Sequence, residues 1–311
     1  MGKIAFLFPG QGAQYIGMGK DLYDNIKECK EIFDKSEEIL GIPIKKLIFE
    51  GPEDELTLTR NNQLAILITS LACQKALSLE GIEADFVAGL SLGEYSALIY
   101  SNVFSFEEGL KIVKKRASIM DSAIEEGIGS MAAVLRLDNE KLDEILKESS
   151  KFGVIEVANF NCPGQVVITG EIDAINKASE LVKEKRGVFV PLKVSGPFHS
   201  SLYEKASYEF YEDLKDIHIN DFDKVVYSNL LGKPYKKDDD IKEILRKHIM
   251  SSVLFEDSIN DMIEKGVDTF IELGPGKTLT GFVKKINRSV KTYNIEDFKS
   301  LKEVVDNLKN I

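Results

Sequence analysis

One serine, Ser91, lies at the centre of the motif Gly89-Leu90-Ser91-Leu92-Gly93, which is typical of a nucleophile elbow. The apolar run before the motif predicts a buried strand, and the residues from Glu94 to Tyr100 predict a helix. The two glycines let the chain bend tightly and let a substrate approach the serine. The following helix would direct its unpaired N–H groups and its positive dipole end at an oxyanion. We therefore predict a nucleophile, against the alternative of an inert serine in an ordinary tight turn.

A serine nucleophile needs a general base, and histidine is the usual one. The sequence holds three histidines. His248 follows Arg246 and Lys247 in a charged helix, and His218 follows an acidic helix, so we expect both to be exposed to solvent. His199 follows a Gly-Pro turn directly after a predicted strand, in the kind of loop that carries function. By elimination, we predict that His199 is the base.

A charged residue, Arg116, falls on the apolar side of a predicted helix from Ser105 to about Ala123. At about 100° per residue the apolar side chains form one arc, with Arg116 between Ile112 and Ile119 and with the lysines opposite. An unpaired buried charge is costly. The guanidinium therefore either snorkels from the edge of the core or binds an anion, and the spacing leaves both open.

A second turn, Pro9-Gly10-Gln11-Gly12-Ala13-Gln14, follows a predicted buried strand at Lys3 to Phe8. It is not a dinucleotide fingerprint, because the third glycine would fall at Tyr15, and it lacks the Gly-Lys-Ser/Thr ending of a phosphate loop. Open α/β sheets bind their ligands at the carboxyl ends of the strands. We therefore expect this turn to border the site, where a backbone N–H can serve as an oxyanion donor.

The composition restricts the class of protein. The formal net charge of −11 and the absence of a long Lys/Arg run argue against a nucleic-acid or membrane-surface binder. The apolar run at Ile4 to Phe8 is too short for a signal peptide, and no apolar run reaches the roughly 18 residues of a membrane span. The three cysteines, Cys29, Cys73 and Cys162, are scattered and odd in number, which predicts neither a disulfide framework nor a metal site. We expect a cytoplasmic protein.

The order of elements predicts an α/β protein with a doubly wound, mostly parallel sheet. Between 131 and 194 the pattern changes to strand–helix–strand–strand–helix–strand, which is typical of a ferredoxin-like unit. We predict a large domain with a hydrolase-like core, residues 1–126 and 197–311, and an inserted ferredoxin-like α+β domain, residues 127–196, that walls one side of a cleft. Elsewhere, helices are expected at 21–39, 64–79, 105–123, 240–250, 256–265, 278–286 and 298–308, and strands at 3–8, 225–228, 269–273 and 291–295.

Several separate motifs occur in a fixed order along the whole chain. They are Phe8–Gln14, Gln63, Gly89–Tyr95, Arg116, Asn159–Asn161, Pro163–Val167, Gly196–His199 and Glu272–Gly276. In this set and order the chain resembles the malonyl-CoA:acyl-carrier-protein transacylases of fatty acid synthesis, which are related to the acyltransferase domains of polyketide synthases. A set of motifs is far more specific than an elbow alone.

The resemblance implies a role for each of these residues. Ser91 would be acylated and His199 would take and return its proton, oriented by a main-chain carbonyl from the segment Ser252-Val253-Leu254-Phe255 rather than by an acid. The N–H groups of Gln11 and Leu92 would form the oxyanion hole. Arg116 would bind the free carboxylate of the malonyl group, which accounts for a charge on an apolar arc.

The resemblance also implies the substrates. Phe198 and Leu92 resemble the residues that select malonyl groups in related acyltransferases, where a bulky side chain beside the base leaves no room for an α-methyl group. Gln63, Asn161 and Gln165 would line the substrate site. Malonyl-CoA and an acyl carrier protein are the expected partners of a monomer that needs no cofactor and no metal. Selection against one methyl group is worth only about 1–3 kcal/mol, so some leakage is expected.

Two positions depart from the family pattern. Leu90 stands where the family usually has histidine, but that side chain is not the base, so we expect activity to survive. The segment at Ser252 usually carries a proline and a more polar pair than Val253-Leu254. A backbone contact tolerates such a change better than a side-chain contact does.

Two other functions compete with this one. A serine hydrolase uses a similar elbow, but it needs no buried arginine and normally shows an acid between the serine and a late histidine. A silent carrier-binding module would have no reason to retain Ser91, His199, Arg116 and Gln11 together.

An acidic carrier would have to bind a local basic patch on this acidic chain. We expect that patch at Lys183, Lys185, Arg186 and Lys193, facing Lys284, Lys285 and Arg288. Ordinary solvated lysines are the alternative.

Overall fold

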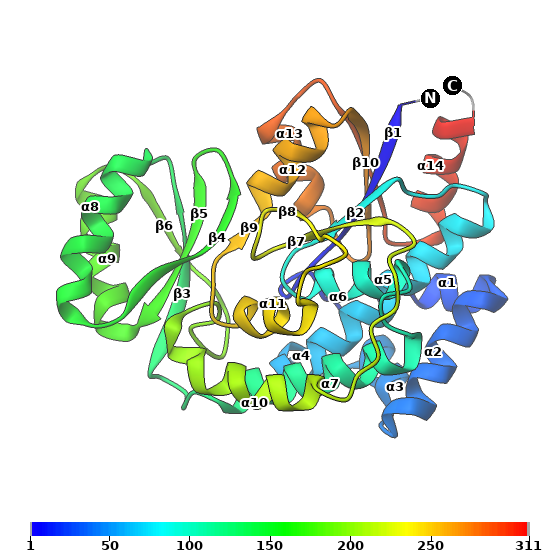
Figure 1. Cartoon of the computed structure of the whole chain (residues 1–311), viewed down its shortest axis with the longest axis horizontal. Helices are drawn as coiled ribbons and strands as arrows, with labels where there is room; N and C mark the ends of the chain where they lie inside the picture. The colour runs from blue at the N-terminus through cyan, green and yellow to red at the C-terminus, as the bar shows by residue number, and fades with distance from the viewer. Residues whose placement is uncertain (1, 310–311) are drawn as a thin grey trace.

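The strands of residues 2–309, the part of the chain that the computed structural model describes, form two sheets (Figure 1). One has six strands in the order β11-β10-β1-β2-β7-β8, with β7 and β8 antiparallel and all other neighbours parallel. The strands are β11 Lys291–Ile295, β10 Val267–Leu273, β1 Lys3–Phe8, β2 Phe86–Gly89, β7 Val225–Ser228 and β8 Lys233–Pro234. Strands from both ends of the sequence thus share one sheet, as predicted.

Both faces of this sheet are buried. Ile4, Phe6 and Phe8 of β1 belong to one core cluster, whereas Ala5 and Leu7 belong to another. Since successive side chains of a strand point to opposite faces, helices must cover both sides of the sheet. This is why the strands are continuously apolar rather than alternating.

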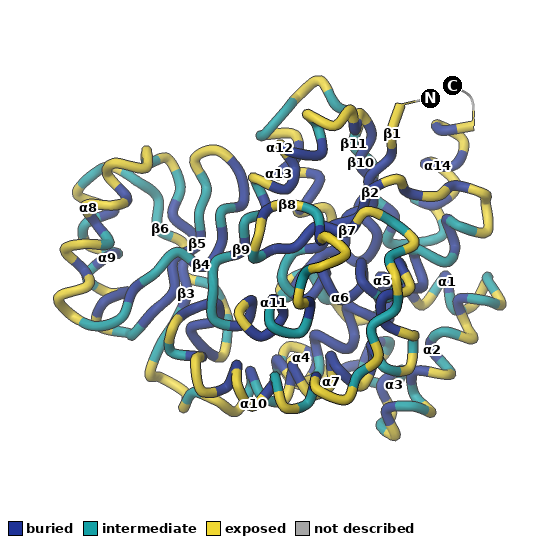
Figure 2. Tube along the Cα trace, viewed as in Figure 1, coloured by how far each residue is buried: buried dark blue, intermediate teal, exposed yellow. Residues whose placement is uncertain are grey.

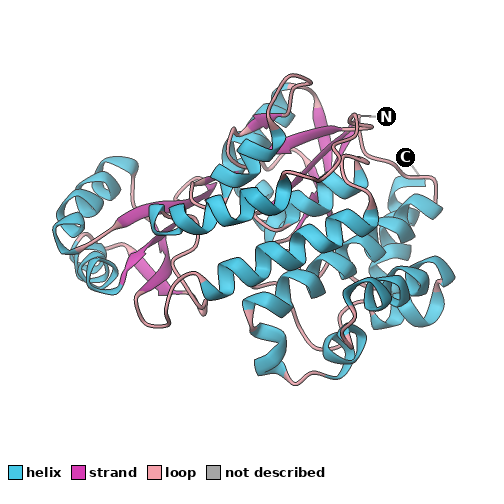
Figure 3. Ribbon diagram, turned by 60° about the horizontal axis from the view of Figure 1, so that its bottom comes forward, coloured by secondary structure: helices cyan, strands magenta, loops and turns pink. Residues whose placement is uncertain are grey.

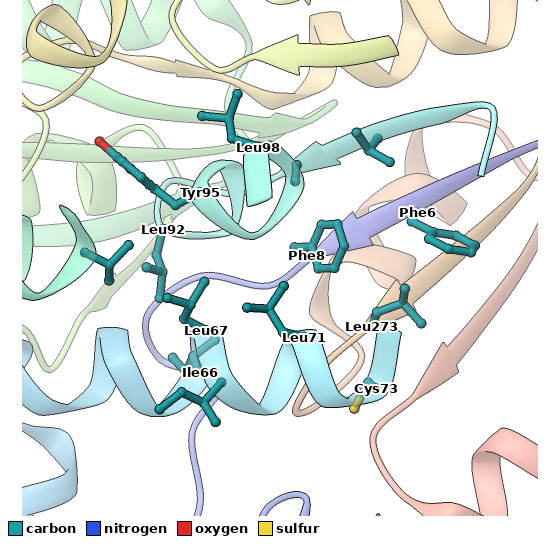
Figure 4. Close-up of a cluster of buried hydrophobic side chains, with 14 of the residues drawn as sticks. Phe6, Phe8, Ile66, Leu67, Leu71, Cys73, Leu92, Tyr95, Leu98 and Leu273 are labelled. Atoms are coloured by element: carbon teal, nitrogen blue, oxygen red, sulfur yellow. The ribbon is translucent and has the colours of Figure 1, made fainter. Parts of the chain in front are cut away.

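The first core cluster lies between the sheet and a layer of helices. Figure 4 shows Phe8 near Leu71 and Leu92 near Leu67, with Leu67 and Leu71 on one long buried helix and Phe6 toward Leu273. The helices that contribute to this cluster are α1 Lys20–Asn25, α2 Lys27–Leu40, α3 Ile44–Glu50, α4 Glu53–Thr57, α5 Thr59–Leu79, α6 Gly93–Tyr100, α7 Phe106–Ser122, α10 Glu204–Leu214, α11 Ile241–His248 and α14 Phe298–Lys309. The second cluster includes side chains of α12 Phe255–Glu264 and α13 Thr278–Ile286.

The second sheet has five strands in the order β6-β3-β5-β4-β9 and lies to the left in Figure 1. The strands are β3 Gly129–Leu135, β4 Ile155–Cys162, β5 Gln165–Glu171, β6 Val188–Pro191 and β9 Val253–Leu254. Helices α8 Asn139–Ser149 and α9 Ile172–Glu184 cover one face, and Figure 3 shows both at the far end of the molecule. Because β9 comes from the later part of the chain and pairs with β4, it ties the two regions together.

The predicted helix at 21–39 is wrong in one respect, since the structure divides it into α1 and α2 at Ile26. This residue adopts extended backbone, with φ −125° and ψ 115°, and its side chain contacts the core. The helix expected at 64–79 begins earlier, at Thr59. The other predicted helices and strands agree with the structure to within a few residues at their ends, whereas α3, β8 and β9 were not predicted.

Buried residues follow the strands of the six-stranded sheet and the helices packed against it (Figure 2). Arg116 is the largest side chain among those with almost no exposure. None of the helices within residues 2–309 combines the length and the hydropathy needed to cross a bilayer.

Candidate active site

A pocket of about 260 Å³ opens where the two sheets meet. The turns after β1 and β2, helices α5, α7 and α13, and strands β3, β4 and β5 all contribute lining residues. All nine side chains that the sequence predicts for the site line this pocket: Gln11, Gln63, Ser91, Leu92, Arg116, Asn161, Gln165, Phe198 and His199. They come from positions up to 188 residues apart, and the fold brings them together.

Ser91 occupies a sharp turn between β2 and α6. Its φ is 52°, in the left-handed region that non-glycine residues rarely adopt. The chain is crowded there, because a Cβ on Gly93 would lie 2.0 Å from the carbonyl oxygen of Phe8 and one on Gly89 would lie 1.9 Å from the carbonyl carbon of Gly93. Only glycine fits at either position. The predicted elbow is therefore present, with the serine at its apex.

His199 lies directly opposite the serine. Its Nε2 is 2.7 Å from Ser91 Oγ, and its Nδ1 is 2.9 Å from the carbonyl oxygen of His248 and 3.2 Å from that of Ser251. Carbonyl oxygens only accept hydrogen bonds, so Nδ1 carries the proton and Nε2 is the free base. This tautomer can accept the hydroxyl proton of Ser91.

Two sequence predictions near this histidine are wrong. His248 was expected to be exposed, but it is fully buried and its ring stacks on that of His199 at 5.2 Å. It lies on the inner face of α11, whose charged neighbours give the helix a polar appearance in sequence. The carbonyl partners come from His248 and Ser251, and not from the segment 252–255, because β9 carries that segment into the second sheet. His218 is exposed as expected.

The pKa of His199 is lowered to about 4. Burial is the main cause and the positive charge of Arg116 adds to it, while the carbonyls of His248 and Ser251 oppose the shift. The imidazole is therefore neutral at physiological pH and ready to act as a base.

Arg116 is fully buried on α7, which excludes snorkelling. Its Nη1 donates to Gln63 Oε1 at 2.6 Å, its Nη2 donates to Ser91 Oγ at 3.0 Å, and its Nε has no partner. The ring of Tyr95 lies 5.1 Å from its Cζ. Among residues 2–309, no carboxylate lies within ion-pair distance of this guanidinium. A buried cation without an anion, facing a pocket, is suited to bind an anionic group.

The turn after β1 lies against the elbow. A Cβ on Gly10 would come within 2.4 Å of the Leu90 carbonyl oxygen, so the two turns touch through their backbones. Within residues 2–309, the backbone N–H groups of Gln11 and Leu92 have no acceptor. The Gln11 side chain donates to Thr59 Oγ1 at 3.2 Å, which anchors the turn to the start of α5.

Three residues beneath the serine were not predicted from the sequence. Asn229 follows β7 and binds the Ser91 backbone, Glu94 is a fully buried acid in the first turn of α6, and Tyr235 donates to Glu94. Burial raises the pKa of Glu94 to about 7, although the hydroxyl of Tyr235 and the N–H of Asn229 oppose this shift. Glu94 directly follows the elbow motif, but nothing in the sequence placed Asn229 beside it.

Within residues 2–309, no cluster of three or more His, Cys, Asp or Glu side chains is arranged to hold a metal ion. The chemistry of the pocket therefore has to be argued from its serine, histidine and arginine.

A serine hydroxyl bonded to a neutral imidazole at the start of a helix is the arrangement found in serine acyl-transfer enzymes. A family model, the acyl transferase domain, matches residues 5–309. The malonyl CoA-acyl carrier protein transacylase of Bacillus subtilis is 46% identical over 313 residues, which cover 99% of this chain and 98% of that protein. The chain therefore belongs to the malonyl CoA-acyl carrier protein transacylases of the acyl transferase family.

Solved structures agree with this assignment. The malonyl CoA-acyl carrier protein transacylase of Clostridium perfringens superposes with a TM-score of 0.96 at 49% identity, covering 99% of this chain and 98% of that one. A malonyl-transacylase in complex with its type II PKS acyl-carrier protein superposes with a TM-score of 0.95 at 32% identity, covering 98% and 99%.

The geometry around His199 predicts an unusual titration. We expect its ring to stay neutral until the pH approaches about 4. In the unfolded chain a histidine has a pKa of about 6.5, so the unfolded state binds more protons between these values and stability falls as the pH decreases from about 6.5 to 4. NMR titration of the ring protons, assigned with His199→Gln and His218→Gln, measures the midpoint. A midpoint at or above 6.5 would contradict the burial argument.

Proposed function

We propose that this protein transfers a malonyl group from coenzyme A to the phosphopantetheine thiol of an acyl carrier protein, through a malonyl ester on Ser91, and so supplies fatty acid chain elongation. The observation that carries the proposal is the buried Arg116 guanidinium, which lacks a carboxylate partner and touches the serine hydroxyl. A hydrolase of neutral esters would have no use for it. Relatives named as transacylases of the same substrate support the proposal.

The first half-reaction begins at Ser91 Oγ, which attacks the thioester carbonyl of malonyl-CoA while His199 Nε2 takes its proton. The N–H groups of Gln11 and Leu92 stabilise the oxyanion of the tetrahedral intermediate. As the carbon–sulfur bond breaks, the imidazolium returns the proton to the sulfur of coenzyme A. In the second half-reaction a carrier thiol gives its proton to His199 and attacks the malonyl ester, and Ser91 recovers the proton.

Arg116 holds the carboxylate of the malonyl group during both half-reactions. Gln63 accepts from Nη1 and fixes the guanidinium plane, so that Nη2 and the unpartnered Nε are directed to the substrate. A planar fork of this kind matches a carboxylate. Acetyl groups lack the carboxylate and leave the cation unpaired.

Other residues of the pocket define its shape. Phe198, which is buried beside the base, and Leu92 restrict the space at the malonyl α-carbon, and this favours malonyl over methylmalonyl groups. Asn161, whose Oδ1 is buried without a partner, and Gln165 serve as polar contacts for the substrate. Leu90 lies at the pocket edge and takes no proton, so its departure from the family pattern leaves the mechanism intact.

We infer that the carrier binds beside the pocket through basic side chains, for which we propose Lys183, Lys185, Arg186 and Lys193 of the smaller region and Lys284, Lys285 and Arg288 facing them. Lys285 donates to Gln165, a residue of the pocket wall, at 2.8 Å, which puts the end of α13 at the pocket. Lys185 is paired with Glu144, so it contributes less charge than its neighbours. The complex of a relative with its acyl-carrier protein supports binding of this kind of partner.

We further infer the finer organisation of the fold. The six-stranded sheet and its helices, residues 1–126 and 197–311, would be a doubly wound domain with a hydrolase-like core. Residues 127–196 would be an inserted ferredoxin-like domain, and the strand order β6-β3-β5-β4 with two helices on one face supports this. A cytoplasmic monomer remains our expectation.

The acyl-enzyme is the direct test of the function. After incubation with malonyl-CoA, we expect intact and peptide mass spectrometry to find a stable malonyl adduct on Ser91, and a much weaker adduct with acetyl-CoA. Addition of a carrier thiol should discharge it, whereas Ser91→Ala should form none. Rapid loss of the adduct to water would favour the hydrolase, and no adduct on the unaltered protein would favour the silent module.

Replacing the buried cation should change the acyl preference. Arg116→Ala is expected to lower malonyl transfer by about 100-fold, since a buried charge-assisted contact is lost, and to favour acetyl groups in relative terms. The ratio of acylation rates with malonyl-CoA and acetyl-CoA measures this. Arg60→Ala, which removes a half-exposed arginine paired with Asp121, is the matched control. Equal losses with both acyl groups would argue against a carboxylate site.

Charge reversal tests the basic patch. The triple variant Lys284→Glu, Lys285→Glu and Arg288→Glu is expected to raise the KM for the carrier by about tenfold at low salt, because steering is lost. Its rate of acylation by malonyl-CoA should stay close to that of the unaltered protein. The control reverses Lys205 and Lys299, which are exposed elsewhere on the surface. An unchanged carrier KM at low salt would refute the proposed docking surface.

A further inference from the structure

Asn229 bridges the two sides of the serine turn from below. Its Oδ1 accepts from the backbone N–H of Ser91 at 2.6 Å, and its Nδ2 donates to the carbonyl oxygen of Gly89 at 2.7 Å. The residue is 1% exposed, so water does not compete for either bond. One side-chain amide thus holds the residue before the turn and the residue at its apex.

The position of Asn229 in the sheet explains this contact. Strand β7 pairs with β2 through Phe86–Val225 and Val87–Val226, and the backbone pairing then stops. Asn229 is the residue after the end of β7. Where β2 ends and the chain turns, the pairing with β7 does not extend to Gly89 or Ser91. The side chain of Asn229 supplies hydrogen bonds to these two residues instead.

Asn229 is itself held by a buried carboxyl group. Its backbone N–H donates to Glu94 Oε2 at 3.1 Å, and the hydroxyl of Tyr235 donates to Glu94 Oε1. Glu94 lies three residues after Ser91, in the first turn of α6. The backbone of Asn229 is therefore fixed to α6, the helix that begins at the nucleophile, and this fixes the position of its side chain.

Asn229 also contacts the segment that orients His199. The carbonyl oxygen of Asn229 accepts from the N–H of Leu254 at 2.8 Å, three residues after Ser251, whose carbonyl binds His199. The ring of His248 lies within 3.3 Å of Glu94 Oε2. Both partners of the reacting pair are thus held by one buried group of side chains.

We propose that Asn229 is a positioning residue of the acylation step: it holds Ser91 in its left-handed conformation, with Oγ aimed at His199, and Glu94 and Tyr235 hold Asn229. The proposal rests on Ser91 being the acylated residue. In this arrangement the Ser91 N–H donates to Asn229 Oδ1, so it is not free to stabilise an oxyanion. The N–H groups of Gln11 and Leu92 are left to face the substrate.

The test measures the single-turnover rate of Ser91 acylation as a function of malonyl-CoA concentration. Asn229→Ala is expected to slow acylation by about 10- to 100-fold, since a small misplacement of a reacting atom is costly. The half-saturating concentration of malonyl-CoA should change by less than about threefold, because Arg116 and Gln63 are unaltered. Asn220→Ala is the matched control, because it removes an asparagine that donates to the carbonyl oxygen of Asn102, and neither residue lines the active-site pocket.

Asn229→Asp gives a readout that a purely structural role would not move. A protonated carboxyl group reproduces the amide, because its O–H can donate to Gly89 while its carbonyl accepts from Ser91. Once ionised, it loses that donor and carries a charge beside Glu94. We expect the ratio of the variant rate to the unaltered rate to fall as the pH rises, whereas protonation of His199 affects both proteins alike.

Acylation of Asn229→Ala within twofold of the unaltered rate would overturn the proposal, as would an Asn229→Asp ratio that does not change with pH. Failure of the unaltered protein to form the acyl-enzyme would instead refute the function on which it rests. If the Asn229 variants do not fold, Tyr235→Phe removes only the outer hydrogen bond. Its acylation should be slower by about fivefold, and an unaltered rate would overturn the proposal.

Discussion

Three backbone segments approach one another closely at Ser91, and this contact fixes the geometry of the site. The carbonyl of Phe8 lies against Gly93, and the residues on either side of the serine touch each other across the turn. This crowding forces the serine into a left-handed conformation, which also positions α6 with its first N–H groups at the nucleophile. His199 has a left-handed backbone as well, with φ 60°. Both members of the reacting pair are therefore held in conformations that only the surrounding fold can maintain.

Burial of positive charge explains the electrostatics of the pocket. Burial is the main reason for the low pKa of His199, and the guanidinium of Arg116, which has no carboxylate at ion-pair distance within residues 2–309, adds to it because a cation disfavours a second cation. The same cation is directed at the serine oxygen, where negative charge develops during attack. The histidine needs no acid, because two carbonyl oxygens hold its Nδ1–H and fix the tautomer. In the reaction proposed above, one buried arginine therefore serves both the reactivity of the serine–histidine pair and the choice of substrate.

Local sequence signals predicted most elements because periodicity and turn residues report directly on backbone conformation. The elbow, the apolar strand at Lys3 to Phe8 and the helix carrying Arg116 were all recognisable in this way. The errors occurred where position in the fold outweighs local composition. His248 lies between charged residues in sequence but on the buried face of α11, and β9 draws the segment 252–255 into a sheet that periodicity could not show. The break at Ile26 has the same origin, since its side chain contacts the core.

Three chemically capable residues can be recognised without any structure: a serine flanked by glycines, a histidine after a Gly-Pro turn, and an arginine on an apolar helix face. Motif spacing is sufficient for this, because each feature is local. How these side chains are arranged depends on the packing of the folded chain. That packing places Arg116 at the serine hydroxyl, determines the carbonyls that orient His199, and brings Asn229 and Glu94 beneath the elbow. These contacts join residues 25 to 138 positions apart, and hydrogen bonds over such separations are set by strand order and helix packing rather than by neighbouring residues.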